Sequence, residues 1–165
     1  MKKYLMIILL LAPMAVFAQK FGHVKAQEII QALPDYTKAK TEIDALQKQY
    51  EADLKSMQDE FRKKGEAFEK EQATLPENIK TRRQQELQDM YQKIQQSYTD
   101  NQQALAKASQ EKMAAITTKV LDAIKTVGQE GGYVYIMDVD SGIPFISTTL
   151  STDVTALVKT KRGLK

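Results

Sequence analysis

The sequence of 165 residues has no cysteine, no tryptophan and one histidine. The absence of cysteine excludes a disulfide scaffold, a thiol nucleophile and a cysteine metal site. Because His23 is the only histidine, one chain cannot form a multi-histidine metal site or a Ser-His-Asp triad. We expect it to be an ordinary strand residue. The seven glycines never form the G-x-x-x-x-G-K pattern that cradles phosphates, so ATP-driven work is not expected.

One acidic segment resembles part of a calcium loop, with Asp138, Asp140 and Gly142 in order. The glycine comes one position early, however, and Thr149 stands where the final glutamate is required. A turn explains this segment better. The other carboxylates stand beside basic residues on predicted helix surfaces, and their pattern does not indicate a cleft that would raise a pKa. The sequence therefore predicts no enzyme, no metal site and no cofactor.

Long hydrophobic runs are absent except near the N-terminus, where Leu5–Leu11 follows two lysines. A basic start, a short apolar run and a small residue at Ala18 are the parts of a secretory signal peptide, so we expect residues 1–18 to be cleaved off. The alternative is an uncleaved membrane anchor, but the run is short and Pro13 falls within its end. Removal of the two lysines lowers the formal net charge from +3 to +1, which weakens any expectation of nucleic-acid binding.

Two long helices are predicted between Lys40 and Val127, where the only helix breakers are Gly65 and Pro76. The outbound half carries apolar residues at steps of three, four or seven: Ile43, Leu46, Tyr50, Leu54, Met57, Phe61 and Phe68. The return half carries a second apolar series: Leu87, Met90, Ile94, Tyr98, Leu105, Met113, Ile116, Val120, Ile124 and Val127. Such spacing places one narrow apolar stripe on each helix, as in a coiled-coil seam. Because proline favours a helix start, we expect an antiparallel hairpin with its tip near residues 74–78.

Two parts of this predicted arm, residues 40–127, differ from the rest. Gly65 is either a tolerated surface glycine or a point at which the arm flexes. The return half is rich in glutamine between residues 84 and 110, and its seam thins to Tyr98 and Leu105 with alanines between them. Because small residues bury less area, we expect the part of the arm near its tip to be the less rigid one.

The two ends of the chain change to strand patterns and form a predicted body, residues 19–39 and 128–165. Phe21–Val24 is a short strand candidate. Gln27–Leu33 is predicted to be helical, with Ile29, Ile30 and Leu33 on one face. Pro34 then kinks or restarts the helix before the long limb begins.

The C-terminal part of this body begins where Gly128 can cap the return helix. Tyr133–Met137 is apolar on both faces, which predicts a central strand. Asp138–Gly142 supplies turn residues, so Ile143–Ser147 is predicted to be a second strand paired by a hairpin. Ser151–Asp153 then offers an N-cap for a short helix. The apolar side of that helix consists of Val154, Leu157 and Val158.

The predicted fold class is α+β and mostly α: a long antiparallel helical hairpin, or coiled-coil arm, on a small β-body. A single copy would leave strand edges open and apolar residues in water. Self-association through the sheet is the economical remedy, and the arms would then project from a shared base with a space between them. The body residues that we expect to support this oligomer are Val24, Val134, Ile136 and Phe145.

Two end segments carry a more specific pattern than the helical middle. The first contains Gly22–Val24, Gln27–Ile30 and Leu33-Pro34, and the second contains Gly132–Asp138, Ile143–Ser147 and Asp153–Thr155. Both are similar to the corresponding segments of the Skp (OmpH-like) family of periplasmic chaperones. The signal peptide, the charged helical middle and the length also fit, so the resemblance covers essentially the whole mature chain.

The resemblance implies a periplasmic homotrimer in which three helical arms on a small β-body enclose a cavity. Unfolded outer-membrane proteins would be held in that cavity without ATP. On the arm, the candidates for apolar contact with such clients are Met57, Phe61, Phe68, Met90, Tyr91 and Tyr98. Each of them could instead belong to the hairpin seam. Basic arm residues could add long-range attraction to acidic clients: Arg62, Lys63, Lys64, Arg82 and Arg83.

Two other functions stay open on the residues alone. One is a secreted structural coiled coil, a spacer or adaptor with one fixed partner, although the broken heptad pattern suits a rigid rod poorly. The other uses the basic tail, Lys159–Lys165, to contact anionic lipid or lipopolysaccharide. Positive charges at an exposed terminus also serve simply for solubility. No nucleic-acid partner is expected.

Overall fold

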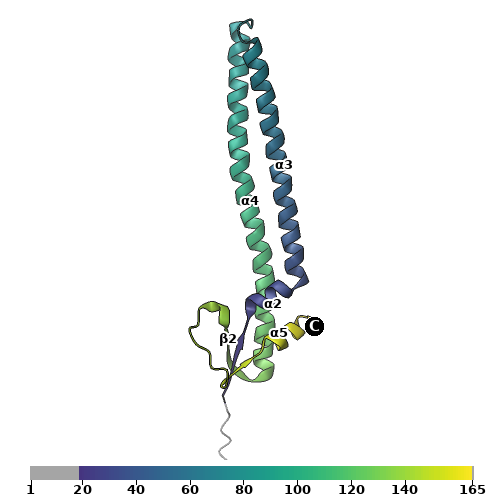
Figure 1. The fold of residues 1–165 in the computed structure, drawn as a ribbon, viewed down its shortest axis with the longest axis vertical. Coiled ribbons are helices and arrows are strands. Elements are labelled where there is room, and N and C mark those ends of the chain that lie inside the picture. Colours follow the sequence, from purple (N-terminus) through teal and green to yellow (C-terminus); the bar gives the residue numbers. More distant parts are fainter. Residues whose placement is uncertain (1–18, 165) are drawn as a thin grey trace, which may run out of the picture.

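The computed structural model describes residues 19–164, so the predicted signal peptide lies outside the described residues. The elements follow one another as β1 (Lys20–Val24), α2 (Ala26–Ala32), α3 (Pro34–Glu71), α4 (Glu77–Gly131), β2 (Tyr133–Asp138), the 3-10 turn η1 (Val139–Ser141), β3 (Ser151–Asp153) and α5 (Thr155–Lys161). Helices α3 and α4 run side by side as one long prong, and all other elements gather at its root (Figure 1). The predicted helical hairpin with a small sheet is confirmed. Assembly of several copies stays a prediction.

The hairpin reverses where the sequence indicates, because α3 ends at Glu71 and Pro76 precedes the first residue of α4. Pro34 restarts the chain as predicted and occupies the first turn of α3, where its missing N–H costs no hydrogen bond. The two helices are unequal, with 38 residues in α3 and 55 in α4. Gly128 lies inside α4 and does not end it. The helix ends because Gly132 adopts the left-handed conformation, with a φ of 65°.

The sheet has three strands in the order β2-β1-β3, and both pairs are parallel. The whole helical arm is therefore the crossover connection between β1 and β2. The expectation that Tyr133–Met137 is central is wrong for the described chain, because β1 is central and β2 is an edge strand. Gly22 permits this arrangement, since a Cβ there would lie 3.0 Å from Ile136 Cγ1. His23 is a strand residue as predicted, and its Nδ1 lies 2.9 Å from Ser151 Oγ on β3.

Ile143–Ser147 is not a strand, so the predicted antiparallel hairpin is wrong. The acidic turn before it has another role: Asp138 Oδ1 accepts a hydrogen bond from Ala26 N at 3.2 Å, and Asp140 Oδ2 accepts one from Gln27 N at 3.1 Å. These carboxylates cap the N-terminus of α2, whose own capping position provides no side-chain hydrogen bond. The cap holds this turn against α2. The loop that follows crosses to the other side of β1, where it forms β3.

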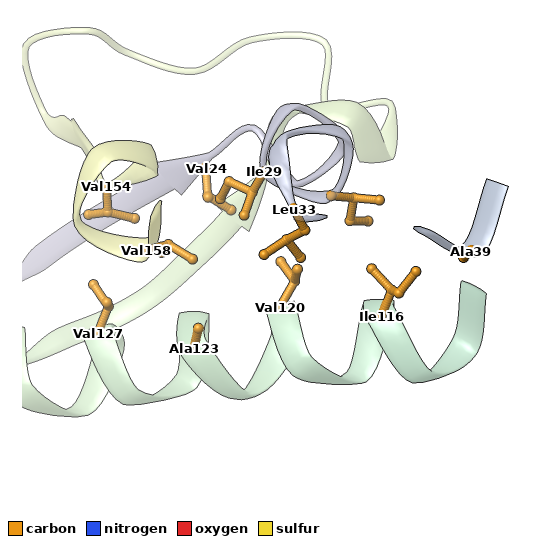
Figure 2. Packing of buried hydrophobic residues seen from close by; sticks show 11 residues of the cluster. Val24, Ile29, Leu33, Ala39, Ile116, Val120, Ala123, Val127, Val154 and Val158 are labelled. Atoms are coloured by element: carbon orange, nitrogen blue, oxygen red, sulfur yellow. The ribbon is translucent and has the colours of Figure 1, made fainter. Parts of the chain in front are cut away.

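The core lies in the body, where five elements meet. Side chains of α4 point toward α2, α5 and β1, as the labelled residues in Figure 2 illustrate. The buried cluster consists of Val24, Ile29, Ile30, Leu33, Ala39, Ile116, Val120, Ala123, Val127, Val154 and Val158. Burial of each Val, Leu or Ile side chain contributes about 1.5–3 kcal/mol relative to exposure. We use "body" for residues 19–39 and 116–164 and "arm" for residues 40–115, because this cluster includes the last turns of α4.

Candidate interaction surfaces

Cross-helix ion pairs tie α3 to α4 at the two ends of the hairpin. At the root, Lys119 Nζ lies 2.6 Å from Asp35 Oδ2, and Lys112 pairs with Glu42. Toward the tip, Lys64 pairs with Glu86, and Arg83 Nη1 lies 2.6 Å from Glu71 Oε2. The hydrogen bond from Lys119 lowers the pKa of Asp35, and those from Lys112 and Lys64 lower the pKa values of Glu42 and Glu86. The pairs show the antiparallel register of the seam between them.

The middle of the seam contains polar side chains. On α4 the half-buried or buried positions run from Ile94 through Ser97 and Asn101 to Leu105. In the register set by the ion pairs, Ser97 and Asn101 lie level with Leu54 of α3. The expectation that Tyr98 belongs to the seam is wrong, because a step of three from Ile94 selects Ser97 and leaves the next residue on the flank of the helix.

The six residues predicted to contact clients fall into two groups. Phe68 is buried within the hairpin, and Met57, Phe61 and Met90 are half-buried along the seam. Tyr91 and Tyr98, by contrast, are 54% and 55% exposed on α4. The Tyr91 ring centroid lies 6.4 Å from that of Phe61, so this tyrosine rests on the seam while it faces solvent. The structure therefore brings only the two tyrosines to an accessible surface.

Most of the basic arm residues singled out in the sequence stand beside acids. Arg62 Nη2 lies 3.1 Å from Asp59 Oδ1, and Lys64 Nζ lies 3.3 Å from Glu60 Oε1 in addition to its pair with Glu86. The hydrogen bond that Lys64 donates to Glu86 raises the pKa of Lys64. Lys63 and Arg82 are exposed. Exposed pairs of this kind add little stability, but they reduce the net charge at the surface of the arm.

A second apolar surface lies on the body, on β2 and the loop after it. Its most exposed residues form what we call the β2 patch: Val134, Tyr135, Met137, Phe145 and Leu150. Four of them, Tyr135, Met137, Phe145 and Leu150, border a cavity of about 290 Å³ whose lining also includes Phe21 and Ile143. Phe21 stacks on Tyr135 with a ring-centroid distance of 4.8 Å.

Of the four residues predicted to support the oligomer, two are exposed and two pack inside the protomer. Val134 is 58% exposed and Phe145 is 79% exposed, whereas Val24 lies in the core and Ile136 packs against it. Tyr135, Met137 and Leu150 are not among the residues that the sequence pattern predicts for the oligomer. Tyr135 and Met137 lie in the apolar strand segment, so the sequence offered a signal for these two residues. Which residues of that segment remain exposed depends on the elements that cover the strand.

The basic tail is partly engaged within the protomer. Lys159 Nζ lies 2.6 Å from Glu28 Oε1, and Lys161 Nζ lies 2.7 Å from Glu130 Oε2. Contact of this tail with anionic lipid stays a prediction. Across residues 19–164, no three His, Asp or Glu side chains gather as they would around a metal ion, and no helix has both the length and the apolar character that crossing a membrane requires.

The family model that matches this chain is described as outer membrane protein (OmpH-like), and it covers residues 20–161. The chain belongs to the OmpH-like family. This membership confirms the resemblance that the two end segments indicate, and it supports a chaperone role. OmpH-like proteins are not typically enzymes, which agrees with the function predicted from the residues.

A solved structure shares the fold of this OmpH-like protein. It is the crystal structure of an OmpH-like protein, assigned as an outer membrane chaperone, from Caulobacter crescentus. The match has a TM-score of 0.76 at 12% sequence identity and covers 87% of this chain and 83% of that one. Among proteins with curated functions, no sequence matches this chain significantly. At such low identity the likeness concerns the fold, so residue roles must be argued from this chain itself.

Proposed function

We propose that this OmpH-like protein is an ATP-independent periplasmic holdase that binds unfolded outer-membrane proteins in a cavity between helical arms. The observation that carries the proposal is the β2 patch at the root of the arm. A chain that leaves five large apolar side chains exposed beside an edge strand needs a partner there. If that partner is another copy, the arms gather around one shared space.

The proposed assembly is a homotrimer, the subunit number implied by the family resemblance. Association buries the β2 patch, with Val134 and Phe145 in the contact and Val24 and Ile136 supporting the strand from inside the protomer. Light scattering on the mature chain tests this. Val134→Asp is expected to yield monomers, because a buried unpaired carboxylate opposes association. Leu121→Asp is the matched control, since Leu121 is 57% exposed on α4, outside the patch, and it should leave the trimer intact.

Holdase action needs no chemical step. A protein that binds the unfolded state lowers the free concentration of chains that aggregate, and the effect grows with the ratio of its concentration to the dissociation constant. The test dilutes a urea-denatured outer-membrane barrel protein into buffer with the mature chain. We expect stoichiometric amounts of chaperone to keep the client soluble without ATP. Aggregation at the same rate as in buffer would remove the holdase proposal.

The alternative is a structural coiled-coil adaptor with one fixed partner. The seam argues against a rigid rod, because Ser97 and Asn101 occupy its middle and only Phe68 and Ile94 are buried between residues 40 and 115. An adaptor should ignore several unrelated unfolded barrels, whereas a holdase should protect all of them.

A further inference from the structure

The two flanks of α4 within the arm differ in chemistry. One flank carries exposed residues at steps of four and three, none of them charged: Gln84, Gln88, Tyr91, Gln95, Tyr98 and Gln102. We call this series the Gln–Tyr stripe. The opposite flank has charged residues at similar spacing: Arg82, Glu86, Asp89, Lys93 and Asp100. A helix that merely needed to be soluble would not require this segregation, because charges on either flank would serve equally well.

The carboxamides of the stripe differ from those of Gln85 and Gln96 on the same helix, and in the described residues Gln92, Gln103 and Gln110 resemble the stripe in making no side-chain hydrogen bond. Gln85 and Gln96, which lie off the stripe, donate at 2.8 Å to Asp89 and Asp100 one turn further on. Among the described residues, the four stripe glutamines make no side-chain hydrogen bond. Their donors and acceptors are therefore available, and they alternate with the two exposed tyrosine rings.

This combination fits one kind of occupant. Each carboxamide offers two donors and one acceptor oxygen, which match the N–H and C=O groups of a peptide backbone. An unfolded chain exposes those groups, whereas a folded protein pairs them internally. Tyrosine supplies an amphipathic surface for apolar side chains beside them. The absence of charge on the stripe disfavours nucleic acid and anionic lipid, both of which require bases.

We propose that the Gln–Tyr stripe binds extended segments of unfolded polypeptide through backbone hydrogen bonds and aromatic contacts. The proposal deepens the proposed function and rests on it. From residue 84 to residue 102 the helix rises about 27 Å, the length of about eight extended residues. A surface that contacts the backbone accepts clients that share only their unfolded state.

The experiment compares two triple variants with the same change in charge. The stripe variant is Gln88→Glu, Gln95→Glu and Gln102→Glu, and the control is Gln92→Glu, Gln103→Glu and Gln110→Glu. The control residues are exposed and share one outward face of α4, since they are spaced by 11 and 7 residues. Because the chaperone has no tryptophan, the fluorescence of a client's tryptophans reports binding directly.

We expect the stripe variant to bind an unfolded barrel protein about tenfold more weakly, because each substitution removes two donors and adds a charge that repels peptide carbonyls. The control should stay within about twofold of the unmodified protein. A second variant, Tyr91→Ser with Tyr98→Ser, should also lose about tenfold. Helix content by circular dichroism should be unchanged in all three variants, because every substituted side chain is exposed.

The outcomes separate this inference from the proposed function. If the unmodified protein does not bind the client, the holdase proposal fails, and the inference falls with it. If the unmodified protein binds and the stripe and control variants lose affinity equally, the holdase survives and the stripe assignment is wrong. The assignment is also wrong if the stripe variants change the mass of the client-free assembly, since the stripe would then contact another copy of the chain.

Discussion

The body and the arm are stabilised in different ways. In the body, α2, α4, α5 and the sheet converge on a cluster in which Leu33, Val120 and Val158 are almost fully buried. Over the 76 positions of the arm, residues 40–115, only Phe68 and Ile94 are buried. The arm depends instead on helix propensity, on ion pairs near its two ends and on a partly polar seam. The body is thus the more densely packed part of the protomer, and we expect the arm to change shape at lower cost.

The sharpest test of this contrast compares two leucine truncations. Leu33→Ala in the body is expected to lower the free energy of unfolding by about 2–5 kcal/mol, because it leaves a cavity in the core. Leu54→Ala at the half-buried seam should cost about 1 kcal/mol, since solvent fills the site. Urea denaturation at one protein concentration measures both. Equal losses would mean that the arm is packed as tightly as the body.

The cap on α2 should have an intermediate effect. Asp138→Ala removes the carboxylate that accepts from Ala26 N and is expected to cost about 1–2 kcal/mol in the same denaturation experiment. Asp138→Asn keeps an acceptor oxygen and should retain most of the stability. If Asn is as destabilising as Ala, the cap is not the reason that this turn lies against α2.

The polar middle of the seam offers a gain of stability. Asn101→Leu is expected to stabilise the arm by roughly 0.5–1 kcal/mol, because an apolar side chain replaces a half-buried carboxamide opposite Leu54. Hydrogen exchange should show slower exchange in the mid-arm and no change in the body. Gln103→Leu, on the exposed outward face, is the control and should leave exchange unaltered. Faster mid-arm exchange in the Asn101 variant would place this residue outside the seam.

The smallest expected effect on stability is that of lowering the pH. The pKa values of Asp35, Glu42 and Glu86 are lowered by their lysine partners. Their contribution is therefore complete above the ordinary pKa values of 3.8 and 4.5 and is lost as the pH falls through the lowered values. Thermal melts at pH 6 and pH 3 should show slightly lower stability at pH 3. Glu42→Gln should reduce that difference, and an unchanged difference would exclude this pair as a contributor.

The hairpin could be predicted from the sequence because its signals are local. Apolar steps of three and four, the break at Pro34 and the reversal before Pro76 all act within a few residues. The exposed residues of the candidate surfaces were harder to predict from the sequence. The apolar series of α4 includes both Ile94 and Tyr98 at a permitted step of four, yet only the first faces α3. The side of the helix that faces its partner depends on how α3 and α4 pack against each other, and that packing involves residues far apart in the chain.

The sequence by itself determined that this protein is a helical hairpin whose ends meet, because helix propensity and apolar spacing are properties of neighbouring residues. It also determined the family, through the two end segments. Only the tertiary structure decided that β1 is the central strand, that Asp138 and Asp140 cap α2, and that the β2 patch and the Gln–Tyr stripe remain exposed. Strand pairing, capping from a distance and burial all depend on which remote segments come together, and that is settled by the free energy of the whole packed chain.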